Sequence, residues 1–122
     1  MKTILIVDDE KSLRKILVDK LSQEEYTLLE AADGSACMEI LETQQVDLVL
    51  LDIMMPVMDG IEVAKQIHES KKLQTKPQIV VLTNNSNMET IAAALSAHAY
   101  TYILKSDNSL STIVETIKET LD

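Results

Sequence analysis

Short apolar runs alternate with segments of helical periodicity along this chain. The runs are rich in Ile, Val and Leu and are bounded by polar residues, which is typical of buried β-strands. They predict five strands, at residues 4–7, 26–32, 46–51, 78–82 and 100–104. The third run is the strongest, and it leads directly into a carboxylate, Asp52, before a turn that contains Pro56 and Gly60.

Between these runs, apolar residues recur every three or four positions, as they do on one face of an α-helix. Asp33 precedes the second such segment as a candidate N-cap, and Gly60 opens the third. Ser86 and Glu89 have the spacing of a capping box for the fourth. The residues that mark the five helices are Leu13, Ile16, Leu17 and Leu21; Cys37, Ile40 and Leu41; Ile61, Ala64 and Ile67; Met88, Ile91, Ala92 and Leu95; and Leu110, Ile113, Val114, Ile117 and Leu121.

Strand and helix thus alternate five times, which predicts an α/β fold. Continuous apolar strands separated by helices favour a parallel sheet that is covered by helices on both faces. Right-handed crossovers then produce a doubly wound (βα)5 sandwich. The chain has 122 residues, which suits one domain rather than two, so we assign residues 1–122 to a single domain.

Polar residues follow all five predicted strands, and those after the first, third, fourth and fifth carry the groups of a possible site. In a doubly wound sheet, ligands bind outside these ends, where the loops that follow the strands meet. The side chains that should converge there are Asp8, Asp9 and Glu10 after the first strand, Asp52 after the third, Thr83 at the end of the fourth and Lys105 after the fifth.

This set of side chains suits a phosphoryl group and a metal ion. Carboxylates held close together repel each other unless a proton or a cation intervenes. Mg²⁺ prefers oxygen ligands, uses one or two carboxylates and leaves coordination positions for water and phosphate. Lys105 adds a second positive charge and Thr83 a hydroxyl donor, which together match the oxygens of a phosphoryl group. Asp52 is then placed to act as a nucleophile.

Composition limits the partners and the cell compartment. The chain carries 20 acidic and 11 basic residues, a net charge of −9, which disfavours binding to nucleic acid and to anionic lipid. Cys37 is the only cysteine, so an internal disulfide is excluded, and we expect its side chain on the buried face of a helix. The N-terminal apolar run is too short for a signal peptide, and no stretch approaches the ~18 apolar residues of a membrane span. We therefore expect a reducing, cytoplasmic setting.

The motifs at the strand ends resemble the receiver domain of two-component response regulators. They are ILIVDDE at 4–10, LVLLDIMMPVMDG at 48–60, VVLT at 80–83 and YILK at 102–105. The resemblance covers the whole chain and implies a flavodoxin-like sheet with the strand order 2-1-3-4-5. It also implies that Asp52 accepts a phosphoryl group from a phosphohistidine, carried by a sensor histidine kinase or a histidine phosphotransfer protein.

The same resemblance implies the metal ligands. Asp9 and Asp52 would bind Mg²⁺ or Mn²⁺ directly, together with the backbone carbonyl of Met54, and Asp8 would act through water. Pro56 and Gly60 would shape the loop after Asp52.

The resemblance further implies a switch. Lys105 and Thr83 would each contact a phosphoryl oxygen, and Tyr102 would turn inward behind Thr83. The surface formed by the fourth helix, the fifth strand and the fifth helix would then change and bind a partner or a second copy of the chain.

The sequence departs from the family pattern at three places. Asn84 stands where a small residue commonly follows the threonine, and His98-Ala99 replaces the usual Gly-Ala. Ser106 replaces the proline that usually follows the lysine. Because a cis bond before a residue other than proline costs roughly 2.5–4 kcal/mol, we expect a trans Lys105–Ser106 peptide.

Other interpretations remain open at this stage. A phosphatase of the haloacid dehalogenase kind also forms an aspartyl-phosphate, but it needs a second Asp where this chain has Met54. An FMN-binding flavodoxin should not carry three acids after its first strand, and a degenerate receiver should not retain the full set of polar groups. We expect no enzyme activity beyond self-phosphotransfer and slow self-dephosphorylation. The chain is either a stand-alone receiver or a piece of a longer regulator.

Two further features have no assigned role. His68 and His98 match no zinc-binding spacing, and we expect them at the surface or at helix ends. Residues 92–99 (AAALSAHA) form a small-residue helical surface that could serve as a docking face.

Overall fold

The computed structural model describes residues 1–53, 55, 59–73, 75–84, 87–99 and 101–122. Within these residues, five strands and five α-helices alternate, with one short 3₁₀ turn before the last helix. The strands are β1 (Lys2–Val7), β2 (Tyr26–Ala31), β3 (Leu48–Leu51), β4 (Gln78–Thr83) and β5 (Thr101–Leu104). The helices are α1 (Lys11–Leu21), α2 (Gly34–Thr43), α3 (Gly60–Glu69), α4 (Met88–Ser96) and α5 (Leu110–Leu121), and the 3₁₀ turn is η1 (Lys105–Asp107).

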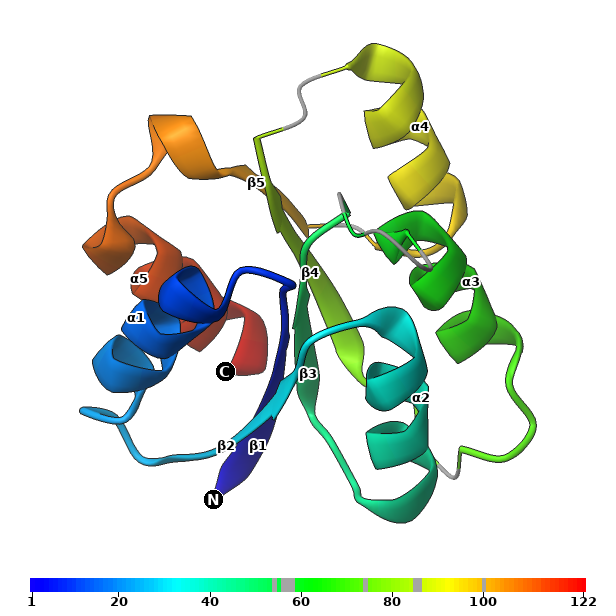
Figure 1. Cartoon of the computed structure of the whole chain (residues 1–122), viewed down its shortest axis with the longest axis horizontal. Helices are drawn as coiled ribbons and strands as arrows, with labels where there is room; N and C mark the ends of the chain where they lie inside the picture. The colour runs from blue at the N-terminus through cyan, green and yellow to red at the C-terminus, as the bar shows by residue number, and fades with distance from the viewer. Residues whose placement is uncertain (54, 56–58, 74, 85–86, 100) are drawn as a thin grey trace.

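The strands form one parallel sheet in the order β2-β1-β3-β4-β5. Helices α1 and α5 cover one face of this sheet, and α2, α3 and α4 cover the other (Figure 1). The predicted doubly wound (βα)5 sandwich and its strand order are therefore confirmed. Tyr100, which we expected to begin the fifth strand, lies outside the described residues.

The core consists of two aliphatic layers, one on each face of the sheet. Every residue of β3 is buried, because this strand lies at the centre of the sheet between β1 and β4. The layer beneath α1 and α5 contains Ile4, Ile6, Leu17, Leu21, Leu48, Leu50, Val80, Leu82, Ile103, Ile113, Val114 and Ile117. The layer beneath α2, α3 and α4 contains Leu5, Val7, Cys37, Val49, Leu51, Val63, Ala64, Ile67, Val81, Ala94 and others.

Cys37 lies fully buried in the second of these layers, as expected for a core cysteine. Burial raises the pKa of its thiol to about 12. The thiol therefore stays protonated at neutral pH and behaves as a small apolar group. Among the described residues, no helix is long and apolar enough to cross a membrane.

Side-chain caps start several helices. The Asp33 carboxylate accepts from the Ala36 N–H at 2.8 Å, so the predicted cap of the second helix is confirmed. For the fourth helix the capping prediction was wrong. The capping side chain is Asn87, whose Oδ1 accepts from the N–H of Glu89 at 2.8 Å. Ser86 lies outside the described residues.

The apolar stripe predicted for the fourth helix marks the helix but not its buried face. Met88 is 77% exposed and Leu95 is 48% exposed, whereas the buried residue of α4 is Ala94. Both faces of this helix carry apolar residues, so helical spacing alone does not decide which face is buried. Ile16 of α1 is likewise half exposed, although it shares the helical spacing of the buried Leu17 and Leu21.

Candidate functional site

Strand register brings the predicted acidic residues to one edge of the sheet. Val7 of β1 lies opposite Leu51 of β3, so Asp8 and Asp52 leave the sheet at the same level. The Asp52 N–H donates to the Val7 carbonyl at 3.0 Å, which extends the strand pairing by one residue. Thr83 is the last residue of β4 and Lys105 follows the last residue of β5, so these groups lie at the same edge.

Three carboxylates meet at this edge. Oxygens of Asp8, Asp9 and Asp52 all lie within 4.8 Å of one another. Asp8 is 2% exposed and Asp52 is 6% exposed, whereas Asp9 faces solvent. Carboxylates this close repel one another, and a cation relieves the repulsion. The all-oxygen donor set, with Asp9 facing solvent, fits Mg²⁺. Within the described residues, no other group of three potential metal ligands is this close. Met54, the predicted carbonyl ligand, lies outside them.

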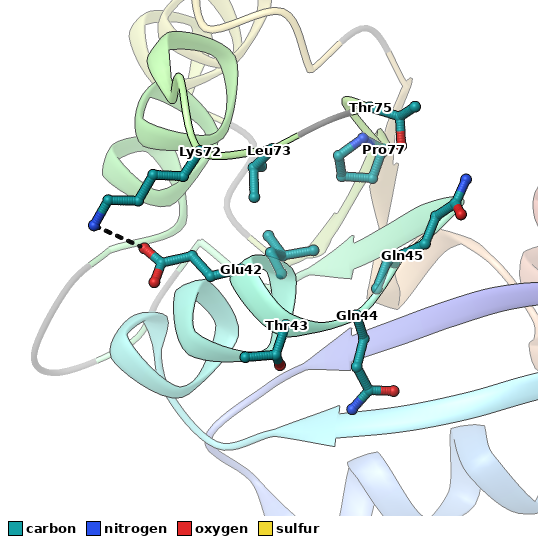
Figure 2. Close-up of a pocket in the computed structure, with 10 residues that line it drawn as sticks. Glu42, Thr43, Gln44, Gln45, Lys72, Leu73, Thr75 and Pro77 are labelled. Carbon is teal, nitrogen blue, oxygen red and sulfur yellow. Dashed lines mark ion pairs between the residues drawn. The ribbon is translucent and has the colours of Figure 1, made fainter.

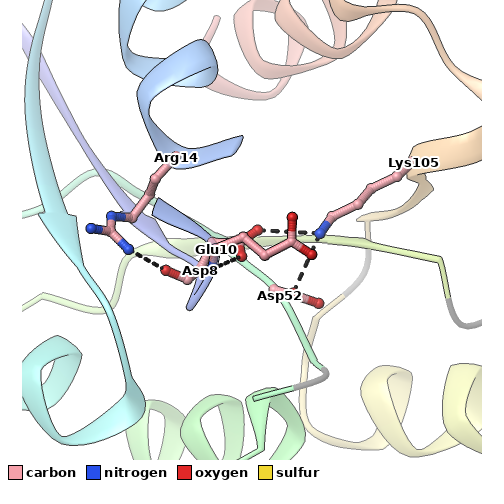
Figure 3. Close-up of polar contacts among 5 residues, drawn as sticks. All are labelled: Asp8, Glu10, Arg14, Asp52 and Lys105. Atoms are coloured by element: carbon pink, nitrogen blue, oxygen red, sulfur yellow. Dashed lines mark hydrogen bonds and ion pairs between the residues drawn. The ribbon is translucent and has the colours of Figure 1, made fainter. Parts of the chain in front are cut away.

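The Lys105 ammonium lies beside two of these carboxylates. Its Nζ lies 3.2 Å from Asp8 Oδ2 and 3.3 Å from Asp52 Oδ2 (Figure 3). Burial of the ammonium by itself lowers the pKa of Lys105, but the charges of Asp52 and Asp8 outweigh it and raise the pKa above its usual value. Lys105 thus stays protonated at neutral pH and neutralises part of the acidic cluster. The Lys105–Ser106 peptide is trans, as predicted, since no described peptide bond is cis.

Two further groups bind Asp8, one at its carboxylate and one at its backbone carbonyl. The Glu10 N–H donates to Asp8 Oδ1 at 2.9 Å, and Arg14 Nη1 donates to the Asp8 carbonyl at 2.7 Å. The sequence analysis overlooked Arg14. Two features of the sequence could have pointed to it. Arg14 is the chain's single arginine, and it lies in the first turns of α1, directly after the acidic motif.

Gly60 is required because α3 begins against the backbone of Asp52. A Cβ at position 60 would lie 2.5 Å from the Asp52 carbonyl oxygen and 2.7 Å from Ile53 Cα. The Gly60 N–H donates to the Ile53 carbonyl at 3.0 Å, which closes the loop between β3 and α3. This contact supports the predicted role of Gly60 in shaping the loop after Asp52. Pro56, the other predicted residue, lies outside the described part of the chain.

Thr83 and Tyr102 lie on neighbouring strands. Thr83 is fully buried at the end of β4. Tyr102 pairs with Val81 in the sheet register and packs against the apolar layer beneath α2, α3 and α4. Burial, and secondarily the charge of Asp52, raises the pKa of the Tyr102 hydroxyl. Tyr102 therefore faces the layer beneath α2, α3 and α4, whereas the neighbouring Ile103 faces the layer beneath α1 and α5.

His68 and His98 lie at exposed helix ends, as predicted, but they also touch each other. Their rings stack with centroids 3.5 Å apart and an interplanar angle of 19°. His98 has φ of 67°, in the left-handed region, and its N–H donates to the Leu95 carbonyl at 3.0 Å. The Ala99 N–H donates to the Ala94 carbonyl at 2.9 Å, which completes a Schellman ending of α4 with histidine in the position that usually holds glycine.

A small hollow lies at the opposite edge of the sheet. It lies between the end of α2 and the segment that leads into β4 (Figure 2), and its volume is about 210 Å³. Val46 and Pro77 line it, and both precede the strands to which Asp52 and Thr83 are attached at the far end. An ion pair of 3.7 Å between Lys72 and Glu42 lies at this hollow. The hollow is therefore separate from the acidic site.

The sequence model of the response regulator receiver domain family matches residues 4–118, and the chain belongs to this family. Domains of this family are the phosphoacceptor modules of two-component signalling systems. Receiver domains are in general phosphoacceptors rather than classical enzymes, and response regulators receive phosphoryl groups from sensor kinases. Their acidic pocket, represented here by Asp8, Asp9 and Asp52, binds Mg²⁺.

Individual relatives agree with this assignment. The chain is 43% identical over 70 residues to the alkaline phosphatase synthesis transcriptional regulatory protein PhoP of Bacillus subtilis, which covers 57% of this chain and 29% of PhoP. Its fold matches a CheY-like receiver domain protein from Methanospirillum hungatei with a TM-score of 0.91 and 31% identity, covering 100% of this chain and 94% of the other. It also matches the response regulator TrrA from Thermotoga maritima, in complex with Mg(2+)-BeF, with a TM-score of 0.85 and 35% identity, covering 99% and 100% of the two chains. The chain spans less than half the length of the curated relatives to which it is similar.

Proposed function

We propose that Asp52 is the phosphoacceptor of this chain and receives its phosphoryl group from the phosphohistidine of a sensor histidine kinase or a histidine phosphotransfer protein. The observation that carries the proposal is the position of the buried Asp52 carboxylate, within 3.3 Å of the Lys105 ammonium and beside two further carboxylates. In the transfer, an Asp52 oxygen forms a bond to phosphorus as the P–N bond of the phosphohistidine breaks. The electron pair of that bond returns to the imidazole nitrogen.

The acidic cluster would hold the metal that this transfer needs. Asp9 and Asp52 would be its direct ligands, with the carbonyl of Met54, and Asp8 would bind through water. Mg²⁺ or Mn²⁺, when bound, neutralises carboxylate charge and stabilises the charge that develops on the phosphoryl oxygens. Lys105 and Thr83 would each donate to one of those oxygens.

The phosphoryl group would be released slowly. A haloacid dehalogenase-type phosphatase places an Asp two residues after its nucleophile, but this chain has Met54 there. Without a general base, water attacks the aspartyl-phosphate slowly, and the chain acts as a signal carrier with only slow self-dephosphorylation. A degenerate receiver is not favoured, because Asp8, Asp9, Asp52 and Lys105 are all in place.

The output would be a surface change at α4, β5 and α5. Phosphorylation would pull the Thr83 hydroxyl toward the phosphoryl group, and Tyr102 would move deeper behind it. This surface would then bind a partner or a second copy of the chain. We assign residues 1–122 to one domain that acts in the cytoplasm, away from membranes. The net charge of −9 argues against direct nucleic-acid binding by this domain.

The test is phosphorylation by a small phosphodonor in the presence of Mg²⁺, read by intact-mass spectrometry. Wild type should gain one phosphoryl group, and Asp52→Asn should gain none. Asp19→Asn is the matched control, because it removes the same charge from an exposed position on α1. Undiminished modification of Asp52→Asn would overturn the assignment.

A further inference from the structure

Arg14 links the acidic loop to the edge strand β2. Its Nη1 donates to the Asp8 carbonyl at 2.7 Å, and its Nε pairs with Glu30 Oε1 of β2 at 3.2 Å. The Arg14 side chain is only 13% exposed. In Figure 3 it approaches Asp8 from the side opposite to Lys105. Every other basic residue of the chain is a lysine, so the planar, two-sided donor is used at this one position.

Each polar group of Asp8 has a bonding partner. Its N–H donates to the Ala31 carbonyl at 3.2 Å, its Oδ1 accepts from the Glu10 N–H at 2.9 Å, and its Oδ2 contacts Lys105. The carbonyl is the remaining group, and Arg14 binds it. A charge-assisted hydrogen bond of this kind is roughly twice as strong as a neutral one.

The Asp8 carbonyl belongs to the peptide that joins Asp8 to Asp9. Because a peptide unit is planar, fixing its oxygen also fixes the position of the Asp9 Cα, from which the Asp9 side chain extends. Asp9 is exposed, and the walls of the site do not confine it as they confine Asp8 and Asp52. The arginine therefore holds the backbone that carries the least confined of the three acids.

We infer that Arg14, anchored by Glu30, is a positioning residue that orients the Asp8–Asp9 peptide and so sets the geometry of the divalent-cation site. The inference rests on the proposed function, because it assigns Asp9 to that site. The inference predicts that Arg14 and Glu30 influence the affinity of the site for the metal without touching it, as groups that orient metal ligands do in other proteins.

The positive charge of Arg14 has the opposite effect on metal binding. A guanidinium near the acidic cluster repels a divalent cation, so loss of charge strengthens binding and loss of orientation weakens it. Two substitutions separate these effects. Arg14→Met removes both the charge and the hydrogen bonds, whereas Arg14→Lys keeps the charge but lacks the two-sided geometry. Glu30→Gln keeps Arg14 and weakens its anchor.

The experiment measures the Mg²⁺ dissociation constant by following amide NMR shifts, and the urea midpoint of the metal-depleted protein. We expect Arg14→Lys to raise the dissociation constant about tenfold. Arg14→Met should raise it by a smaller factor, because its loss of charge partly offsets the loss of orientation, and Glu30→Gln should also raise it by less than Arg14→Lys does. Lys118→Met is the control, because it removes a positive charge and the 2.8 Å contact to Glu24 far from the site. It should leave Mg²⁺ affinity unchanged.

Three results would overturn the inference. Unchanged Mg²⁺ affinity in folded Arg14→Lys with a lowered urea midpoint would show that the arginine is only structural. Tighter binding in Arg14→Met with unchanged binding in Arg14→Lys would show that only its charge matters. Absence of Mg²⁺ binding in wild type would remove both this inference and the proposed metal site. Phosphorylation of wild type at Asp52 tests the proposed function separately.

Discussion

Helices α4 and α5 lie on opposite faces of the sheet beside β5, but they bury very different side chains. Helix α5 buries Ile113, Val114 and Ile117. Within α4 the buried residue is Ala94, while Met88 and Leu95 face solvent. Burying one branched aliphatic side chain contributes roughly 1.5–3 kcal/mol, and an alanine contributes much less. Apolar burial therefore stabilises the packing of α5 on the sheet more than that of α4, which is held weakly.

This difference suits a signalling domain. Elements with few buried apolar contacts have the lowest local stability, and they are the ones that move in allosteric proteins. Thr83 is the last residue of β4, and α4 is the next element along the chain. The weakly held helix therefore follows the strand that carries the Thr83 hydroxyl. Asp52, in contrast, follows a strand whose residues are all buried. The proposed acceptor therefore follows a strongly packed strand, and we expect the surface of α4 to shift more easily.

The comparison predicts a large effect in α5. Ile117→Ala removes a fully buried side chain and leaves a cavity beneath α5. We expect the free energy of unfolding to fall by about 2–5 kcal/mol, measured by urea denaturation. A loss of under about 1 kcal/mol would mean that the buried face of α5 does not stabilise its packing on the sheet strongly.

A smaller effect is expected at the end of α4. His98 adopts φ of 67°, which costs a residue with a Cβ roughly 1–2 kcal/mol and costs glycine little. Replacing histidine also removes the stack on His68, which is worth about 0.5–1.5 kcal/mol. His98→Gly and His98→Ala both lose the stack, so we expect the glycine variant to be more stable by about 1 kcal/mol.

His68→Ala serves as the control for the stack, because it removes the ring contact without touching the left-handed residue. Its urea midpoint, compared with that of wild type, measures the stack alone, and the difference between His98→Gly and His98→Ala measures the backbone strain. Equal stability of His98→Gly and His98→Ala would contradict the strain argument.

The smallest effect is expected on the outer face of α4. Leu95→Ser changes a half-exposed residue, so we expect the free energy of unfolding to change by no more than about 0.5 kcal/mol. Phosphorylation of Asp52 by a small donor should keep its wild-type rate. A loss of stability comparable with that of Ile117→Ala would show that Leu95 packs against the body of the domain and that the two helices are alike.

Much of the site could be predicted from the sequence because it depends on chain order. Asp8 and Asp52 directly follow apolar strands, and parallel strands place their carboxyl ends at one edge. The structure confirms that these two acids, Asp9 and Lys105 come together. The roles assigned to Thr83 and Tyr102 stay predictions. The sequence marks Arg14 as a lone arginine after the acidic motif, but it does not identify Asp8 as the partner, because an arginine in the first turns of a helix has many possible partners.

The sequence by itself determined the alternation of strands and helices, the parallel sheet and the acidic edge. These follow from local periodicity and from the order of polar residues after each strand. Only the tertiary structure decided which face of α4 is buried, that His68 stacks on His98, and that Arg14 joins Asp8 to Glu30. The physical reason is that these contacts depend on how closely distant elements approach one another. Helical spacing sets which residues share a face, and packing against the sheet decides which face turns inward.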